Sequence, residues 1–261
     1  SDRYGRRPVL LAAIGGLGLM FLLTPLVTSL GQLLATRIFG GALAANFSVA
    51  NAYVADVSSH EHRAKSFGKI GAAIGIGFII GPMLGGLLGH IDIRLPFFVA
   101  AGLSFLNLLY GWFVLPESLP PDRRKRIVLA RANPLMSLHG LVKLKGAGAL
   151  VIVFALTTLA QFVLHTVWVL YAAFRFDWGP RESGLSLFVV GLMAAIVQGG
   201  LIGWLMRSLG ERRVVIAGLA SGTLAYAGFG LATQGWMMYA IIAANVLAYA
   251  VGPALNAVVS K

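Results

Sequence analysis

Residues 66–89, SFGKIGAAIGIGFIIGPMLGGLLG, decide the fold of this chain. The stretch holds a single charged side chain, Lys69, near its start. A helix needs about 20 apolar residues to cross the roughly 30 Å hydrocarbon core of a bilayer, and this stretch is long enough. Lipid offers no partner for backbone N–H and C=O groups, and a membrane barrel would instead show strands of about 10 alternating residues. The stretch therefore predicts a membrane-spanning helix.

Similar apolar stretches flank it, separated by short polar or turn-forming joints. The eight expected spans are 9–28, 32–55, 66–89, 95–115, 148–172, 184–206, 213–232 and 236–258. Only 11% of the 261 residues are charged, whereas a soluble domain carries roughly 25% because water must wet its surface. An all-α membrane protein is predicted, and a single water-soluble core is excluded. The absence of cysteine excludes disulfides and thiolate metal sites, and no metal site is expected.

The net charge of +12 reflects orientation in a membrane. Seventeen of the 21 Lys and Arg residues fall in joints on one side of the expected spans, and three, Arg94, Arg175 and Arg181, fall on the other. Such asymmetry in short loops marks the cytoplasmic side, so the N-terminal loop is predicted to be cytoplasmic. Anionic lipid headgroups are the expected neighbours of these basic loops, and no nucleic-acid partner is expected.

The joint at 116–147 is longer than the others. We expect it to be a cytoplasmic linker between an N-terminal half, 1–115, and a C-terminal half, 148–261. Its weakly amphipathic stretch Leu135–Leu144 fits a helix on the membrane surface or a solvated linker equally well. The chain opens on the polar segment SDRYGRRP without an initiator Met or signal peptide and stops at Lys261, so we expect both ends to be cuts in a longer protein.

A shift of about 205 residues overlays the two halves. The loop SDRYGRRPVL, built around Gly5, meets MRSLGERRVV, built around Gly210. The segment ANAYV at 50–54 likewise meets LNAVV at 255–259. Parallel duplication of a multi-helix unit builds many transporters, which bind substrate at the interface between the halves. A chance match between apolar segments is the alternative.

Polar groups inside the spans are candidates for a substrate or proton pathway. Arg37 lies about 9 Å into its helix, where a guanidinium costs about 2.5–3.5 kcal/mol unless it faces a partner or a wet cavity. At 100° per residue, Gly41, Ser48 and Asn51 share its face, and snorkelling to the outer headgroups is the alternative. The fifth span has a second polar face, composed of Thr158, Gln161, His165 and Trp168.

His165 is the only histidine expected well inside a span, and the charge of an imidazole can change near neutral pH. It could bind substrate, relay a proton or hydrogen-bond another helix. Gln198 in the sixth span and Asn256 in the eighth are further candidates for the pathway. A purely structural amide is the alternative for Gln198.

Glycines in the third span recur every four residues, at Gly77, Gly81, Gly85 and Gly89. They leave one helical face without side chains, so we expect a neighbouring helix to approach closely there. Pro82 removes one backbone hydrogen bond and is expected to bend the helix. Glycines that served only to pack two helices together would not need the proline, so the pattern favours a bend with a functional role.

These motifs carry a family resemblance. The opening loop Asp2-Arg3-Tyr4-Gly5-Arg6-Arg7 resembles the D-R-x-G-R-R loop between the second and third helices of major facilitator transporters, and Arg37 matches the fourth-helix arginine of that family. The third span looks like the G-x8-G-x3-GP-x2-GG antiporter motif of drug exporters in the superfamily. That motif falls on Gly68, Gly77, Gly81, Pro82, Gly85 and Gly86. The segments VADVSSHEHRAKSFG, LPES, ANPL and HTVWVLYAAFRFDW, with the Gly-Glu-Arg-Arg loop, are similar to tetracycline efflux pumps.

The resemblance covers the whole chain and implies helices three to ten of twelve. It implies alternating access, in which a proton moving inward drives export of a drug-like amphipathic compound, with tetracycline as one candidate. It also implies a latch that closes the cytoplasmic side, although ordinary loop charge that fixes topology is the alternative. The latch residues would be Asp2, Arg3, Gly5, Arg6, Arg7 and Asp56.

The chain departs from the tetracycline pumps at two positions. Met20 and Gly222 stand where those pumps carry acids. The coupled proton must then be carried in missing helices, at an edge acid such as Asp2 or Asp56, or at His165. This departure argues against tetracycline as the substrate, but export of another drug-like molecule is still expected.

The main alternative is a proton-coupled uptake symporter for a nutrient or metabolite on the same fold. No H-E-x-x-H, G-x-S-x-G or Walker motif is present, so no enzyme is expected. The expected partners are a small-molecule substrate and membrane lipids, with the proton as coupling ion and no other cofactor. We expect the complete protein to be a monomer in a bacterial inner membrane.

Overall fold

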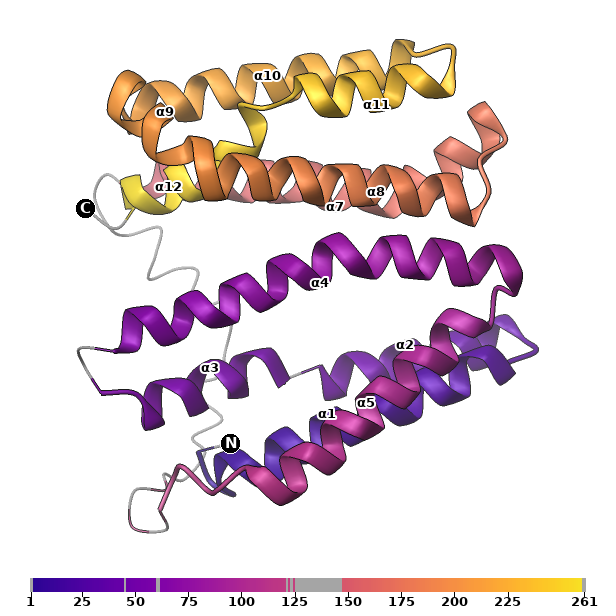
Figure 1. Cartoon of the computed structure of the whole chain (residues 1–261), viewed down its shortest axis with the longest axis vertical. Coiled ribbons are helices and arrows are strands. Elements are labelled where there is room, and N and C mark those ends of the chain that lie inside the picture. Colours follow the sequence, from indigo (N-terminus) through magenta and orange to yellow (C-terminus); the bar gives the residue numbers. More distant parts are fainter. Residues whose placement is uncertain are drawn as a thin grey trace. The chain divides into compact units, whose positions relative to one another are not determined.

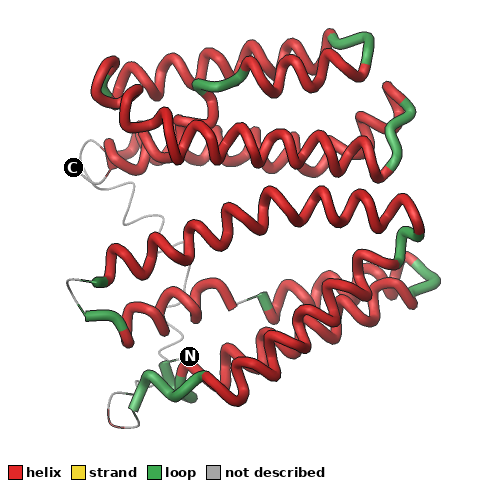
Figure 2. Tube along the Cα trace, viewed as in Figure 1, coloured by secondary structure: helices red, strands yellow, loops and turns green. Residues whose placement is uncertain are grey.

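The computed structural model describes residues 2–44, 46–59, 62–120, 122, 124 and 147–259, and these residues form helices and connecting loops without a strand (Figures 1 and 2). Residues 125–146, which include most of the predicted linker and the stretch Leu135–Leu144, lie outside the described residues. The side chain of Asn256 also lies outside them. The prediction of an all-α membrane protein is confirmed.

The helices before the predicted linker are α1 (Arg6–Leu23), α2 (Leu30–Leu43), α3 (Asn46–Val57), α4 (Arg63–Ile91) and α5 (Leu95–Val114). Those after it are α7 (Ala147–Phe176), α8 (Pro180–Ile196), the π-helical turn η4 (Val197–Leu201), α9 (Ile202–Leu209), α10 (Glu211–Leu231), α11 (Gly235–Ala244), the 3₁₀ turn η5 (Ala248–Ala250) and α12 (Val251–Val259).

Within the described residues, seven helical stretches are long and apolar enough to cross a membrane, or eight if the bent pair at the C-terminal end is one span. The first seven are Arg6–Leu26, Leu30–Val57, Lys65–Ile91, Leu95–Val114, Ile152–Phe176, Pro180–Leu209 and Glu211–Leu231. The predicted boundaries agree with these to within about four residues.

The eighth span is broken, which corrects the prediction of a continuous helix over 236–258. α11 ends at Ala244, and the chain bends by 51° before it continues through η5 and α12. Asn245 caps α11, and its side-chain Oδ1 accepts a hydrogen bond of 2.8 Å from Ser221 Oγ of α10. Pro253, near the start of α12, has no N–H to donate to a helical hydrogen bond.

Two features support the predicted repeat. The second span also breaks, after α2 ends at Leu43, close to the position that the 205-residue shift pairs with the break at Asn245. The two Arg-rich loops end in glycines of matching backbone conformation, Gly5 at φ 100° and ψ 163° and Gly210 at φ 78° and ψ 153°. These are the only positive-φ glycines in the part of the chain that the structure describes.

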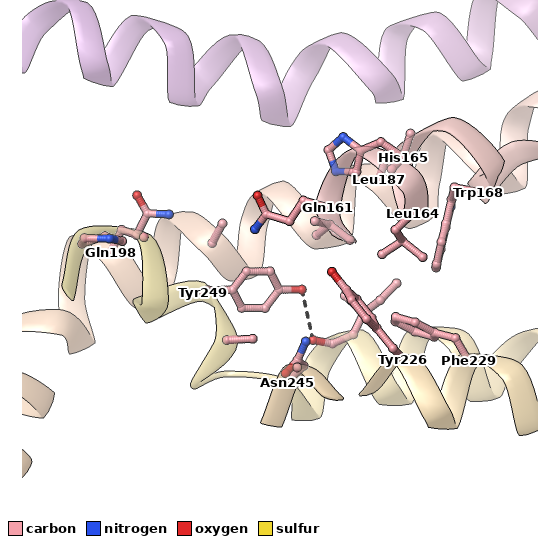
Figure 3. Close-up of a pocket in the computed structure, with 17 residues that line it drawn as sticks. Gln161, Leu164, His165, Trp168, Leu187, Gln198, Tyr226, Phe229, Asn245 and Tyr249 are labelled. Carbon is pink, nitrogen blue, oxygen red and sulfur yellow. Dashed lines mark hydrogen bonds between the residues drawn. The ribbon is translucent and has the colours of Figure 1, made fainter. Parts of the chain in front are cut away.

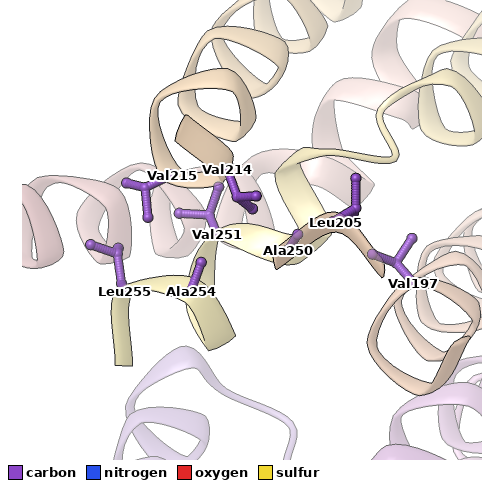
Figure 4. Close-up of a cluster of buried hydrophobic side chains, with 8 residues drawn as sticks. All are labelled: Val197, Leu205, Val214, Val215, Ala250, Val251, Ala254 and Leu255. Carbon is purple, nitrogen blue, oxygen red and sulfur yellow. The ribbon is translucent and has the colours of Figure 1, made fainter. Parts of the chain in front are cut away.

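The chain divides into two compact units, residues 1–74 with 91–129 and residues 75–90 with 130–261. In the first unit α1 packs on α5, α2 and α3, and small residues allow the α1–α5 contact: a Cβ on Gly111 would lie 3.0 Å from Leu11 Cδ2. In the second unit a cluster of eight buried apolar residues joins η4, α9, α10, η5 and α12 (Figure 4). Van der Waals contact of this kind, rather than exclusion of water, holds helices together in lipid.

Candidate functional site

A cavity of about 310 Å³ lies in the second unit, between α7, α8, α10 and the broken eighth span (Figure 3). Its floor is buried and apolar: Trp168 is 4% exposed and Ile242 is 1% exposed. Gln161, His165, Gln198 and Tyr226 line the same cavity and are exposed. The cavity is therefore amphipathic, with an aromatic interior and a polar mouth.

The floor is held in place by contacts that satisfy its polar atoms. The Trp168 indole donates a 2.9 Å hydrogen bond to Ser186 Oγ, and Ser186 in turn donates to the Ser183 carbonyl. The ring of Phe229 packs edge-on against Trp168 at 5.2 Å between centroids. Trp168 therefore presents apolar ring surface to the cavity, with its N–H already paired.

Four residues of the predicted pathway meet at this cavity: Gln161, His165, Trp168 and Gln198. Gln198 lies in the π-helical turn η4, a backbone irregularity that is frequent at functional sites. The sequence analysis missed Tyr226, Asn245 and Tyr249, which also line the cavity. Asn245 was detectable as an amide in the middle of an apolar span. Gly222, one of the two departures from the tetracycline pumps, is a lining residue as well.

Arg37 lies in the first unit, with its guanidinium carbon 5.9 Å from the centroid of the Phe97 ring of α5. The predicted polar face with Ser48 and Asn51 assumed one continuous helix. Arg37 and Gly41 lie together in α2, but α2 ends at Leu43, so the 100° spacing alone does not place Ser48 and Asn51 of α3 on the same face, and that part stays a prediction. Ser48 is exposed and Asn51 is half-buried in α3.

The predicted latch residues gather at one end of the first unit. The Arg6 guanidinium pairs with Asp2, and its Nε donates to Asp56 Oδ2 at 3.0 Å. Arg7 Nη2 donates to the Trp112 carbonyl at 2.6 Å. Arg3 is exposed and stacks over Tyr4. The opening loop, the end of α3 and the end of α5 are thus tied together through two arginines.

The sequence analysis did not assign Glu117, in the LPES segment, to this network. Its Oε1 accepts hydrogen bonds from the backbone N–H of Arg6 at 2.8 Å and of Leu119 at 3.0 Å. Burial acts to raise the pKa of Glu117, but these hydrogen bonds, a third from the N–H of Arg7 and the charge of Arg124 together lower it. The ionised carboxylate is therefore the form that the folded structure favours.

The lowered pKa predicts an acid-dependent contribution to stability. A carboxylate with a depressed pKa stabilises the fold fully above its ordinary value of 4.5, and the contribution disappears as the pH falls through the lowered value. We expect Glu117→Gln to be less stable than the parent protein at pH 7, and the difference to shrink in strong acid. Thermal unfolding in detergent, from pH 7 into strong acid, measures the stability difference between the parent protein and Glu117→Gln. A difference that does not change with pH would contradict a lowered pKa for Glu117.

The two positive-φ glycines offer a matched pair of substitutions. Alanine at either position adopts a backbone region reserved almost entirely for glycine, at a cost of about 1–3 kcal/mol. At Gly210 the new Cβ meets nothing within 4 Å, whereas at Gly5 it would overlap Glu117 Oε2 and lie 3.2 Å from Arg124 Nη2. We expect Gly5→Ala to lower the melting temperature and transport more than Gly210→Ala. Equal effects would show that Glu117 does not restrain the loop.

Within the second unit α4 contacts α8 through Gly86, which belongs to the predicted antiporter motif but lies outside the predicted stripe. A Cβ on Gly77, Gly81 or Gly85 would meet nothing within 4 Å. A Cβ on Gly86 would lie 2.6 Å from the Pro180 carbonyl oxygen and 2.8 Å from Gly184 Cα. These three glycines of the predicted stripe therefore do not meet α8, and the close approach of another helix to the stripe stays a prediction. The contacting face begins one residue, or 100°, further round the helix.

The partner face on α8 is glycine-rich as well. A Cβ on Gly184 would lie 2.5 Å from the Pro82 carbonyl oxygen, and one on Gly191 would lie 3.1 Å from Ile79 Cα. Backbone therefore meets backbone along this crossing, which only small residues allow. Pro82 and Gly86 belong to the predicted antiporter motif, so the motif does supply the close approach.

A bundle of apolar helices with a polar-mouthed cavity defines a polytopic membrane protein built like a secondary transporter. The model of the Major Facilitator Superfamily matches residues 1–261, and the chain belongs to this family. It is a multi-pass protein of the bacterial inner membrane, and its family is a class of transporters rather than of enzymes.

Relatives share sequence with most or all of the chain. It is 38% identical to a tetracycline resistance protein of class C from Escherichia coli and 37% identical to one of class G from Vibrio anguillarum, covering 100% of this chain in each case. It is 30% identical to multidrug resistance protein 2 of Bacillus subtilis over 85% of the chain and 56% of that protein. The chain spans 66% of the length of the first two relatives.

Solved structures share the fold. The human organic anion transporter MFSD10 (TETRAN) superposes with a TM-score of 0.68 at 26% identity, covering 100% of this chain and 65% of that one. A bacterial homologue of the human lysosomal transporter Spinster superposes with a TM-score of 0.70 at 16% identity, covering 97% of this chain and 61% of that one.

Proposed function

We propose that the full-length protein exports a drug-like amphipathic compound by alternating access, driven by a proton that moves inward. The observation that carries this proposal is the cavity of the second unit, with its aromatic floor and its mouth of amide and imidazole groups. Small molecules bind in cavities that are mostly apolar and that place a few polar groups at defined points. The names of the relatives, which refer to tetracycline and multidrug resistance, support a drug as substrate.

The network around Arg6 supports the second part of the proposal, a gate on the cytoplasmic side. It joins three separate segments through charged hydrogen bonds, which are among the stronger polar contacts in proteins. An alternating-access protein needs contacts that form in one state and break in the other. The proton serves as the coupling ion without a further cofactor, and the complete protein works as a monomer surrounded by lipid.

Proteoliposomes that contain the full-length protein and a pH-sensitive dye in the lumen test this function. Addition of tetracycline or another aromatic drug outside should make the lumen more alkaline, because an antiporter releases protons as substrate enters. Acidification of the lumen would instead support an uptake symporter. No response to any drug in a broad panel would contradict proton-coupled drug transport.

A further inference from the structure

Among the residues that the structure describes, none that lines the cavity of the second unit carries a fixed charge. None of the seventeen residues that line it is Asp, Glu, Lys or Arg. The segment of α4 in the same unit, residues 75–90, has no ionisable side chain before His90 at its end. Among the described residues that line this cavity, only a histidine and two phenols can therefore exchange a proton.

His165 is the group placed for that exchange. It lies one helical turn after Gln161 on the same face of α7, and both side chains stand at the mouth of the cavity (Figure 3). Its ring is exposed. Among the described residues no hydrogen bond to a ring nitrogen of His165 is present, so the structure gives it no role in fastening one helix to another.

The other titratable groups that face His165 are two phenols. Tyr226 comes from α10 and Tyr249 from η5, while α8, η4, α11 and α12 contribute apolar, glycine or amide groups. Tyr249 already donates a 3.3 Å hydrogen bond to the Ile242 carbonyl, drawn as a dashed line in Figure 3. A phenol ordinarily loses its proton near pH 10, whereas an imidazole changes charge between about pH 5 and 8.

We propose that His165 is the point at which substrate and proton compete, and that the substrate is an uncharged aromatic molecule carrying a hydroxyl or N–H donor. This inference rests on the proposed export function. The aromatic part of the molecule lies against the ring surface of the floor, and its donor reaches the unprotonated nitrogen of His165 at the mouth. A cavity without carboxylates offers no counter-ion to a permanent cation, so it does not select one.

The exchange balances with one proton for each substrate. A neutral imidazole has one N–H donor and one lone pair, and the lone pair accepts the donor of the substrate. When a proton binds to that nitrogen, the ring has two donors and no acceptor, so the hydrogen bond breaks and the substrate leaves unchanged. Loss of the proton on the cytoplasmic side restores the lone pair and the affinity for the next molecule.

Binding of 2-naphthol and of its methyl ether, 2-methoxynaphthalene, to the full-length protein in detergent tests this inference. Both probes are small, uncharged and aromatic, and only the first has a donor. We expect 2-naphthol to bind more tightly at pH 8 and its affinity to fall by up to about tenfold per pH unit once the imidazole is mostly protonated. The methyl ether should bind weakly at all pH values between about 5 and 8.

His165→Asn and His165→Gln keep a polar side chain that does not titrate, and both should remove the pH dependence of 2-naphthol binding. His90→Asn, the same change at the exposed end of α4, should leave it intact. A pH dependence that persists in both His165 variants, or equal affinity for the two probes, overturns the inference. So does loss of folding in both variants by size exclusion, because His165 would then be structural.

Transport measurements distinguish failure of this inference from failure of the proposed function. Drug-dependent alkalinisation of proteoliposomes with unchanged pH dependence in His165→Gln would leave export standing and reject His165 as the exchange point. Absence of any proton movement with any drug would reject the function itself.

Discussion

Gly86→Leu should abolish transport by the full-length protein, and Gly86→Ala should lower both transport and thermal stability. The reason is the backbone contact between α4 and α8, where even a methyl group on Gly86 would come within 2.6 Å of the Pro180 carbonyl oxygen. Overpacking of this kind costs about 1–3 kcal/mol because the helices must move apart. Proteoliposome transport and melting in detergent measure the two effects.

Gly85 supplies the matched control, one residue away in the same motif. A Cβ there meets nothing within 4 Å, so Gly85→Ala should melt within about 0.5 kcal/mol of the parent protein. Gly184→Ala on α8 should reproduce the defect of Gly86→Ala, because its Cβ would lie 2.7 Å from Gly86 Cα. The assignment of the contact face fails if Gly85→Ala proves more damaging than Gly86→Ala.

Arg6→Gln should remove most transport while leaving a folded protein. This change takes away the group that joins Asp2 to Asp56 and leaves two carboxylates without their shared cation. A hydrogen bond to a charged group contributes about 1.5–3 kcal/mol, so the state of the protein that contains this network loses stability relative to the other state. Arg6→Lys should rescue partly, since a single ammonium replaces the fork of the guanidinium.

Arg3→Gln is the control for net charge. Arg3 belongs to the same loop, but it is exposed and stacks only on the neighbouring Tyr4 among the contacts of the described residues. If loop charge alone matters, through topology, both substitutions should impair transport equally. A defect confined to Arg6→Gln, at equal amounts of protein in the membrane, supports the latch.

The positions of the spans could be predicted because lipid imposes a length and a composition on every helix that crosses it. The grouping of Asp2, Arg6 and Asp56, and that of Gln161, His165 and Gln198, were also accessible from spacing and resemblance. The sequence did not show which face of α4 contacts α8. Neighbouring glycines such as Gly85 and Gly86 differ by 100° around the helix, and composition alone does not show which of them meets a partner.

Two further features could not be predicted from the sequence because they involve contacts between distant segments. Glu117 joins the latch because the chain after α5 returns to the opening loop, and a sequence pattern does not contain that proximity. The break occurs at Asn245, whose side chain accepts a hydrogen bond from Ser221 of another helix. The apolar composition of 236–258 alone predicts an unbroken helix, which the structure corrects.

The widened turn η4 has a consequence for the packing of α9. A π turn accommodates one residue more than an α turn, so the side chains on its two sides are out of phase by about 100° relative to a regular helix. If Val197–Leu201 tightened into a regular helix, the side chains of α9, including the buried Leu205, would rotate by about 100° relative to those of α8. A deletion of Gly199 or Gly200 would impose that rotation permanently, so the packing of α9 against α10 and α12 depends on a single additional residue in the backbone.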